Sequence, residues 1–330
     1  MKHFLLALLL MPGSAWARQA GKKKEVEFQK RVDAAIEKGL RYLKGSEPSP
    51  PGFDIGETYH LALWTYVHAG VPETDPEFQK LFKRMLGEEL AATYKVALEA
   101  MILEEVDRVK YQERIAQCGQ FLVDNMSPIG QWGYGTPTTY DKFLPVPTGT
   151  PRRAVGTGGG KPPPSIVDFA RRQKPPVRMK IRIKKKRDGA THDNSNTQYA
   201  ALGLRACHDA GIEFEKSVLE RARKWWIDCQ IKEEGPGEDK SAATGGGRGF
   251  PAVGWCYSEG GAKAHCAPGC GAMTAGAVGA LCILDYMLDG EEKRTWKQNP
   301  AVSGGFSWLT RNFSVTQNPG VCDMGGAGVH

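Results

Sequence analysis

Apolar positions recur at steps of three and four residues along five stretches of the chain, a spacing that places them on one face of an α-helix. These stretches are residues 25–43, 75–86, 111–125, 215–230 and 301–313. Helices of a second kind, dominated by small and apolar residues, are expected between them at residues 57–69, 93–106, 193–204 and 273–281. The alternation predicts an all-α protein in which amphipathic helices cover a layer of small, apolar ones.

The helices of the second kind share one sequence phrase, a threonine followed by small or apolar residues three, four and five positions later. The threonines are Thr58, Thr93, Thr197 and Thr274. Positions three and four residues apart lie on one face of a helix, so the phrase marks the equivalent face in each of the four helices. Four copies indicate a helical repeat. A chance likeness among alanine- and leucine-rich helices is the alternative.

Two loops carry a Trp-x-Tyr sequence at the same point of this repeat. Trp132 and Tyr134 follow the amphipathic helix at 111–125, and Trp255 and Tyr257 follow the one at 215–230. A threonine helix comes next in both cases. The common order predicts antiparallel helix hairpins in two concentric layers, with the threonine helices inside. Each hairpin needs its neighbours, because it cannot bury its apolar face alone.

The first 17 residues have the features of a secretory signal peptide. Met1-Lys2-His3 is a basic start, residues 4–11 are apolar, and Ala15-Trp16-Ala17 fits the cleavage pattern of small residues. The apolar run is too short to span a bilayer, and no transmembrane segment is expected elsewhere. Cleavage near Ala17 predicts an exported protein, periplasmic or extracellular.

Residues 142–190 form an insert with a different composition. Its first part is rich in proline and glycine, and residues 171–187 hold ten lysines or arginines and no acid. Such a segment buries too little apolar area to offset the entropy of ordering, so no regular structure is expected. Its charge suits an anionic envelope polymer or lipid head groups. Because aromatic residues are few, nucleic acid is a poor candidate; a solvated insert without a partner is the alternative.

The chain contains eight cysteines, and an exported protein can form disulfides. Cys256, Cys266 and Cys270 lie close in sequence to His265, a set whose donor atoms suit zinc. Their spacing matches no compact zinc motif, and the loop is rich in glycine. A loop disulfide or free thiols are therefore favoured over a metal site, and neither a metal nor a cofactor is predicted.

The chain resembles the prenyltransferase and squalene-oxidase repeat proteins, the superfamily of the squalene–hopene cyclases. The segment from Trp226-x-x-x-Gln230 to Gly254-Trp255 is similar to a degenerate repeat motif of that family, and so is the stretch 127–134. The resemblance covers roughly residues 30–319 apart from the insert. It implies a terpenoid-cyclase-like α/α toroid, a ring of helix hairpins in two layers, over residues 25–320.

About nine helices would leave such a ring incomplete at its C-terminal side. Residues 321–330 are rich in glycine, where the family would continue with a helical segment. We therefore expect an irregular tail after an open toroid, as in a truncated or frame-shifted gene product. A longer reading frame in the source DNA would support that hypothesis.

In the cyclases, an Asp-x-Asp-Asp-Thr motif delivers the proton that starts the reaction. The corresponding stretch here, Asp193-Asn194-Ser195-Asn196-Thr197, keeps only the first and last of those residues. The hydroxyl of Ser195 is far too weak an acid to protonate an alkene. The zinc ligands of the protein prenyltransferases are also missing, and Met273 stands where thioester domains carry glutamine. The resemblance thus implies the fold more than the chemistry.

The starts of the threonine helices and the Trp-x-Tyr loops are expected to meet at the concave end of the toroid. The residues placed there are Asp193, Asn194, Asn196, Trp132, Tyr134, Trp255 and Tyr257. Aromatic rings beside a carboxylate and amides suit an isoprenoid, a glycan or another small molecule. The predicted function is a binding or scaffold module of the cell envelope. The alternative is an enzyme acting on an isoprenoid or glycan with Asp193 as acid or base. For Asp193 itself, a purely structural role as the cap of its helix is the competing interpretation.

Overall fold

The computed structural model describes residues 13–45, 58–140, 145–147, 177–184, 192–231, 252–257, 269–290, 293 and 295–320. Within these ranges the protein is mostly helical, as the periodicity predicts. The helices are α1 (Gly13–Gly45), α2 (Thr58–His68), α3 (Pro76–Gly87), α4 (Thr93–Asp107), α5 (Gln112–Asp124), α6 (Asn194–Asp209), α7 (Lys216–Asp228), α8 (Gly271–Asp289), α9 (Pro300–Arg311) and the short 3-10 helix Thr295–Gln298. Three short strands are β1 (Pro145–Pro147), β2 (Val177–Lys180) and β3 (Ile212–Glu213).

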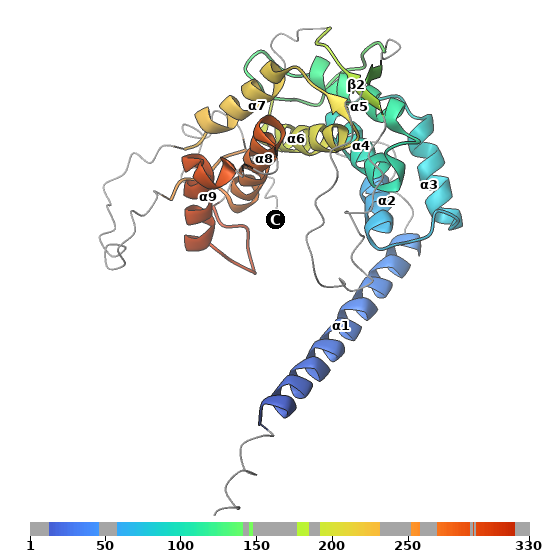
Figure 1. The fold of residues 1–330 in the computed structure, drawn as a ribbon, viewed down its shortest axis with the longest axis vertical. Coiled ribbons are helices and arrows are strands. Elements are labelled where there is room, and N and C mark those ends of the chain that lie inside the picture. Colours follow the sequence, from blue (N-terminus) through green and yellow to red (C-terminus); the bar gives the residue numbers. More distant parts are fainter. Residues whose placement is uncertain are drawn as a thin grey trace, which may run out of the picture.

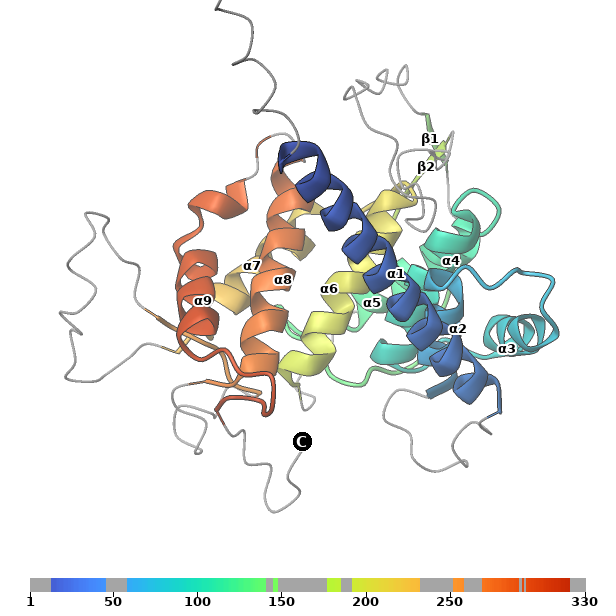
Figure 2. The same ribbon diagram turned by 90° about the horizontal axis from the view of Figure 1, so that it is seen from below.

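Four helices stand side by side in chain order, with α2 packed against α4, α4 against α6, and α6 against α8. The other helices cover this row: α3 packs on α2, α5 on both α4 and α6, and α7 and α9 on α8. Figure 1 shows an arc with α2, α4, α6 and α8 along its inner side and α3, α5, α7 and α9 outside, and Figure 2 again shows α6 beside α8. The inner row consists of the four threonine helices identified in the sequence.

Glycines occupy the contacts between inner helices, where a larger residue would not fit. A Cβ atom at Gly203 of α6 would lie 2.9 Å from the Cα of Ala97 in α4. A Cβ atom at Gly276 of α8 would lie 2.3 Å from Oε1 of Gln198 in α6. The contact at Gly203 is with the backbone, so this glycine sets the spacing of α4 and α6, whereas Gly276 leaves room for the side chain of Gln198.

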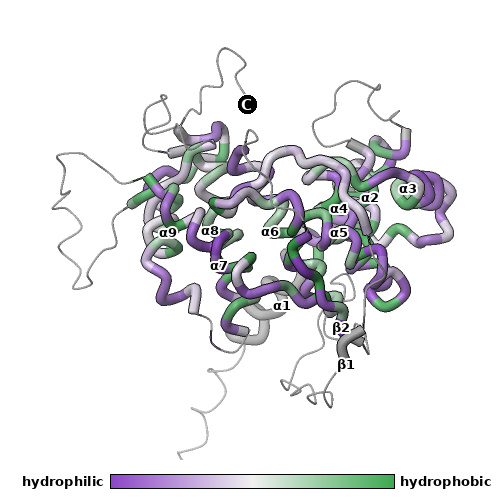
Figure 3. Tube along the Cα trace, turned by 90° about the horizontal axis from the view of Figure 1, so that it is seen from above, coloured by the Kyte–Doolittle hydropathy of each residue, from purple (hydrophilic) through white to green (hydrophobic). Residues whose placement is uncertain are grey.

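The outer helices bury one face and expose the other, as their three- and four-residue spacing predicts. In α3 the buried residues are Phe78, Leu81 and Met85. Asp75 caps this helix, because its side chain accepts hydrogen bonds from the backbone N–H groups of Glu77 and Phe78. Hydrophilic and hydrophobic segments alternate along α3 and α7 in Figure 3. The amphipathic pattern therefore turns each outer helix toward the inner row.

Helix α1 begins at Gly13, earlier than the amphipathic stretch in the sequence suggests. It includes the last residues of the expected signal peptide, whose first twelve residues lie outside the described part of the chain. Leu40 and Leu43, near its end, pack against the core, and Lys44 forms an ion pair with Asp75 before α3. Figure 1 shows the rest of α1 leading away from the arc.

Helix α8 is long and apolar enough, by length and composition alone, to cross a membrane, although no such segment was expected from the sequence. In the structure, 44% of its apolar window is buried, and the helix packs against α6, α7 and α9. Its buried side chains, among them Leu281 and Leu284, belong to the hydrophobic core. The composition of α8 thus fits its place among three neighbouring helices.

Two stretches of the insert at residues 142–190 differ from the expectation of no regular structure. β1 pairs antiparallel with β2, and β2 pairs parallel with β3, which follows α6. From residue 178 to residue 184, exposed basic side chains alternate with Met179, Ile181 and Ile183, which are turned toward the protein. Ile181 is 1% exposed. An alternation of exposed and buried residues is typical of a half-buried strand. In the sequence this alternation was overlooked, because the positive charges dominate the composition of the insert.

Candidate functional site at the starts of the inner helices

The loop after α5 connects the starts of two inner helices. The backbone N–H of Trp132 donates to Oγ1 of Thr197 at the start of α6 (3.1 Å). Two residues later, the carbonyl of Tyr134 accepts from the backbone N–H of Thr93 at the start of α4 (2.7 Å). The indole N–H of Trp132 donates to the carbonyl of Leu122 near the end of α5 (2.7 Å). One loop therefore ties α4, α5 and α6 together.

The loop after α7 repeats these contacts one inner helix further along. The backbone N–H of Trp255 donates to Oγ1 of Thr274 near the start of α8 (3.1 Å). The carbonyl of Tyr257 accepts from the N–H of Asn194 at the start of α6 (2.9 Å). The indole N–H of Trp255 donates to the carbonyl of Trp226 near the end of α7 (2.7 Å). This second loop ties α6, α7 and α8 together in the same way.

Three of the threonines that define the inner helices form hydrogen bonds with these loops. Thr93, Thr197 and Thr274 are all 0% exposed, and each bonds a backbone group of a Trp-x-Tyr loop. The side chain of Thr58 lies outside the described residues. Because one set of hydrogen bonds joins α4 to α6 and again α6 to α8, the inner row is held by a repeated connection.

Asp193 closes the start of α6 and is 9% exposed. Its Oδ1 accepts from the backbone N–H of Asn196 (2.7 Å) and from the hydroxyl of Ser195 (2.5 Å). Its Oδ2 accepts from Nδ2 of Asn196 (2.8 Å), and the residue has the extended backbone of an N-cap. The carboxylate is thus committed to the helix start, which is the capping role foreseen for it.

Replacement of this cap should weaken the fold measurably. We expect Asp193→Ala to lower the free energy of unfolding by about 1 kcal/mol, because the first turn of α6 loses its acceptor. Asp193→Asn, which keeps a side-chain oxygen, should lose less. Urea unfolding followed by circular dichroism measures both, and an unchanged midpoint for Asp193→Ala would refute the capping role.

Four tyrosines lie near one another at this end of the inner row, and two of them contact Ser195. The rings of Tyr94 in α4 and Tyr199 in α6 are 4.3 Å apart. The hydroxyl of Ser195 lies 3.0 Å from that of Tyr257, and Tyr94 also forms a hydrogen bond with Ser195. Tyr134 lies near enough to Tyr257 to contribute to its raised pKa. We call Tyr94, Tyr134, Tyr199 and Tyr257 the tyrosine cluster.

The cluster offers neutral hydroxyl groups and partly open aromatic faces. Burial raises the pKa of Tyr94, Tyr199 and Tyr257, and the smaller opposing effect of the Ser195 hydrogen bond on Tyr94 and Tyr257 does not reverse this. The phenols therefore stay protonated at neutral pH and can donate hydrogen bonds. Tyr134 is 47% exposed, and the other three rings are half-buried. Such a surface can pack against a ring-shaped ligand and bond its polar groups.

The structure separates the residues predicted for this end into two groups. Those enclosed by protein, at 0 to 1% exposure, are Trp132, Trp255, Asn194 and Asn196. Asn194 shows their role, because its Oδ1 accepts from the indole of Trp225 in α7 (2.9 Å) and its Nδ2 donates to the carbonyl of Cys256 (2.8 Å). Tyr134 and Tyr257 reach the surface. The first group joins helices, and the second is placed to meet a ligand.

Tyr94 and Tyr199 belong to the cluster, but they are not among the site residues predicted from the sequence. Tyr94 directly follows Thr93, and Tyr199 comes two residues after Thr197. The repeated phrase is defined by positions three to five residues after each threonine, where the buried face lies. A tyrosine within two positions after the threonine of two successive inner helices was the signal that could have found them.

Four of the six described cysteines are buried. Cys118 and Cys207 are buried free thiols in the core, Cys256 and Cys270 are also buried, and Cys229 and Cys282 are half-buried. Cys266 and His265, which completed the zinc alternative, lie outside the described residues. Among the residues that the structure describes, no group of three or more histidine, cysteine, aspartate or glutamate side chains could hold a metal ion.

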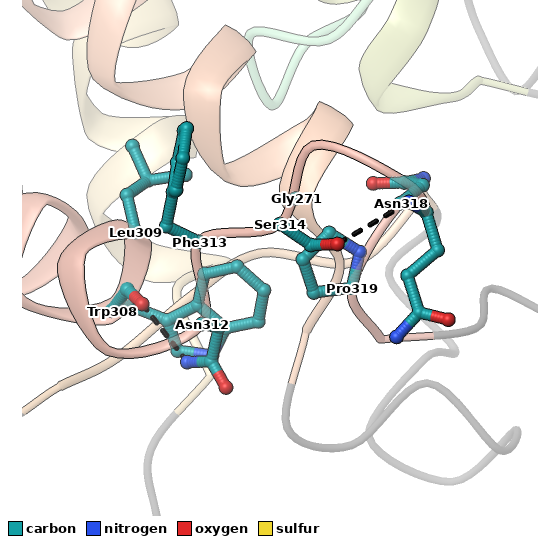
Figure 4. A pocket seen from close by; sticks show the side chains of 9 residues that line it. Gly271, Trp308, Leu309, Asn312, Phe313, Ser314, Asn318 and Pro319 are labelled. Atoms are coloured by element: carbon teal, nitrogen blue, oxygen red, sulfur yellow. Dashed lines mark hydrogen bonds between the residues drawn. The ribbon is translucent and has the colours of Figure 1, made fainter.

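A pocket of about 270 Å³ lies at the α8 side of the row, between the start of α8 and the residues that follow α9. Its lining residues are Gly271, Trp308, Leu309, Asn312, Phe313, Ser314, Gln317, Asn318 and Pro319. Figure 4 shows the side chains of Trp308, Asn312 and Phe313 around it. Asp193 and the tyrosine cluster are not part of this lining.

Comparison with protein-family models, with curated proteins and with solved structures yields no match. The two repeated loops and the tyrosine cluster are therefore the features of the chain from which we infer a function.

Proposed function

We propose that this protein is an exported binding or scaffold module of the squalene-cyclase-like α/α-toroid type. The observation that carries the proposal is the duplicated set of hydrogen bonds around Trp132 and Trp255, which joins successive inner helices by the same contacts. Repeat proteins stacked in this way typically present one shared surface for binding. Here that surface is the end of the inner row that carries the tyrosine cluster.

The ligand best suited to the tyrosine cluster is a neutral glycan. Three of its four phenols are half-buried and protonated, and Ser195 links two of them by hydrogen bonds. Sugars present both apolar ring faces and hydroxyl groups, so stacking and hydrogen bonding act together. An isoprenoid has no polar groups along its chain and could not use the remaining hydrogen-bonding capacity of these hydroxyls.

The removal of two hydroxyl groups tests this proposal. We expect the chain to bind a soluble oligomer of β-1,4-linked N-acetylglucosamine in isothermal titration calorimetry. The double variant Tyr94→Phe/Tyr257→Phe keeps both rings and should bind about tenfold more weakly, because two hydrogen bonds to the ligand are lost. Tyr42→Phe, on the exposed side of α1, is the matched control and should leave the affinity unchanged.

Two other outcomes would contradict the proposal. If the oligomer does not bind, or if the double variant binds as well as the control, the tyrosine cluster is not a glycan site. Retention of squalene from detergent micelles in place of the glycan would favour the isoprenoid alternative.

An enzymatic role for Asp193 is the second candidate. It is favoured by the chain of hydrogen bonds from Asp193 through Ser195 to Tyr257, which places a carboxylate next to a partly exposed phenol. It is disfavoured by the hydrogen bonds from the backbone N–H and the side-chain amide of Asn196, which engage both oxygens of the carboxylate. Turnover of squalene or of the oligomer that disappears in Asp193→Asn at unchanged stability would establish it.

A further inference from the structure

A line of positive charge runs over the outer surface of the protein, along α5. Arg178, Lys180, Arg182 and Lys184 are all exposed, and we call these four residues the basic ridge. Successive residues of the ridge are two positions apart, so their side chains leave the same face of the extended segment, about 6.6 Å from one to the next. The ridge is therefore roughly 20 Å long.

The segment below the ridge is anchored by its backbone and by its inward side chains. The N–H groups of Met179 and Ile181 donate to the carbonyls of Gly211 and Glu213, each at 3.0 Å. The N–H of Lys184 donates to Oδ1 of Asp124 at the end of α5 (3.0 Å). These bonds fix the direction of the basic side chains before any partner arrives, which reduces the ordering cost of binding.

Two further contacts hold the segment along α5. Nε2 of Gln120 donates to the carbonyl of Arg182 (2.9 Å). The side chain of Ile181 lies directly against Gly119, where an added Cβ would be 2.8 Å from its Cδ1. The second half of the ridge thus lies on the outer helix α5.

The surroundings of the ridge favour a narrow partner over a broad one. Glu213 of β3 lies beside it, partly exposed, and pairs with Arg178 at 2.9 Å, so the positive charge is limited to a line. A flat anionic surface would meet this carboxylate as well. Among the described residues of the segment, none of the exposed side chains is apolar or aromatic, so neither insertion into a membrane nor stacking on bases is supported.

We propose that the basic ridge binds a linear polyanion with phosphate groups along its backbone, held lengthwise over residues 178–184. Guanidinium and ammonium groups are the usual protein donors to phosphate, and arginine binds it through two parallel N–H groups. Cations at a fixed, even spacing allow several phosphates of one chain to be bound together. Further lysines and arginines at positions 185–187 extend the same charge along the sequence.

The test measures binding of long-chain inorganic polyphosphate by fluorescence anisotropy at several salt concentrations. The ridge variant carries Arg178→Gln, Lys180→Gln and Arg182→Gln. It should bind on the order of tenfold more weakly than the unchanged protein, and the slope of log K against log salt should fall by about 2. Because all three side chains are exposed, its thermal midpoint should stay the same.

The matched control carries Lys30→Gln, Lys38→Gln and Lys83→Gln, which remove the same charge from exposed positions on α1 and α3. The control should bind polyphosphate like the unchanged protein. Equal weakening in both variants would show a general attraction by net charge and overturn the proposal. Tighter binding to vesicles of anionic phospholipid than to polyphosphate would overturn it in favour of a membrane surface.

Discussion

Trp132→Ala should cost this protein about 3–5 kcal/mol of stability, the largest loss that we expect from a single substitution. The indole is 0% exposed, and its N–H bonds the carbonyl of Leu122 while its backbone bonds Thr197. Removal of the ring leaves a cavity among α4, α5 and α6 and an unpaired carbonyl at the end of α5. Urea unfolding at constant pH measures the loss.

The same prediction applies to Trp255, because it has the same contacts with α6, α7 and α8. Trp255→Ala should therefore lose a similar amount. Trp296→Ala, in the partly exposed 3-10 helix, serves as the control and should lose far less. Large but unequal losses at Trp132 and Trp255 would argue that the two loops are not equivalent.

Arg114→Met should produce the second largest effect, about 3 kcal/mol at pH 8. Arg114 in α5 donates to Oε1 of Glu99 in α4 (2.6 Å) and to the carbonyl of Glu88 (2.9 Å). Glu99 is 3% exposed, so removal of its cation leaves a buried carboxylate without an opposite charge. The double variant Glu99→Gln/Arg114→Met should recover part of the loss, because no charge then remains buried.

The same pair gives the stability of the unchanged protein a defined pH dependence. Burial raises the pKa of Glu99 to about 7 despite the bond to Arg114, while the pKa of Arg114 is also raised and its guanidinium stays charged. A carboxyl group that holds its proton more tightly when folded stabilises the fold at low pH. Its contribution is lost as the pH rises from the usual value of glutamate through 7.

Unfolding in urea at pH 5.5 and pH 8 tests this sign. We expect the Glu99 contribution to favour the lower pH, the difference to grow in Arg114→Met, and the difference to disappear in Glu99→Gln. A contribution from Glu99 that increases toward pH 8 would mean that Arg114 outweighs burial.

Helix positions followed from the sequence because their causes are local. Apolar spacing placed the outer helices α3, α5 and α7 within a few residues of their observed bounds. The threonine phrase placed the starts of the inner helices, whereas α6 and α8 continue beyond the expected ends to Asp209 and Asp289. The capping role of Asp193 could also be predicted, because an aspartate directly before a helix commonly accepts hydrogen bonds from the backbone N–H groups of the first turn. The Trp-x-Tyr loops were recognised as equivalent, and their hydrogen bonds supply the physical reason.

Features that depend on contacts between distant segments could not be read from the sequence. Glu99 looks like a surface residue until α5 covers it with Arg114. The strand at Val177–Lys180 was hidden because ten positive charges dominate the composition, although Ile181 and its neighbours alternate with them. The tyrosine cluster comes from separate parts of the chain, and only the stacking of α4 on α6 brings Tyr94 to Tyr199.

Hydrogen exchange of the indole N–H groups of Trp132 and Trp255, followed by NMR, tests the repeated connection most directly. Both groups are buried and lie 2.7 Å from a carbonyl at the end of an outer helix. We predict that both exchange as slowly as the backbone amides of α6, because each opens only when inner and outer helices separate. Exchange of either indole at the rate of an exposed loop would contradict the claim that one connection, used twice, holds the inner row.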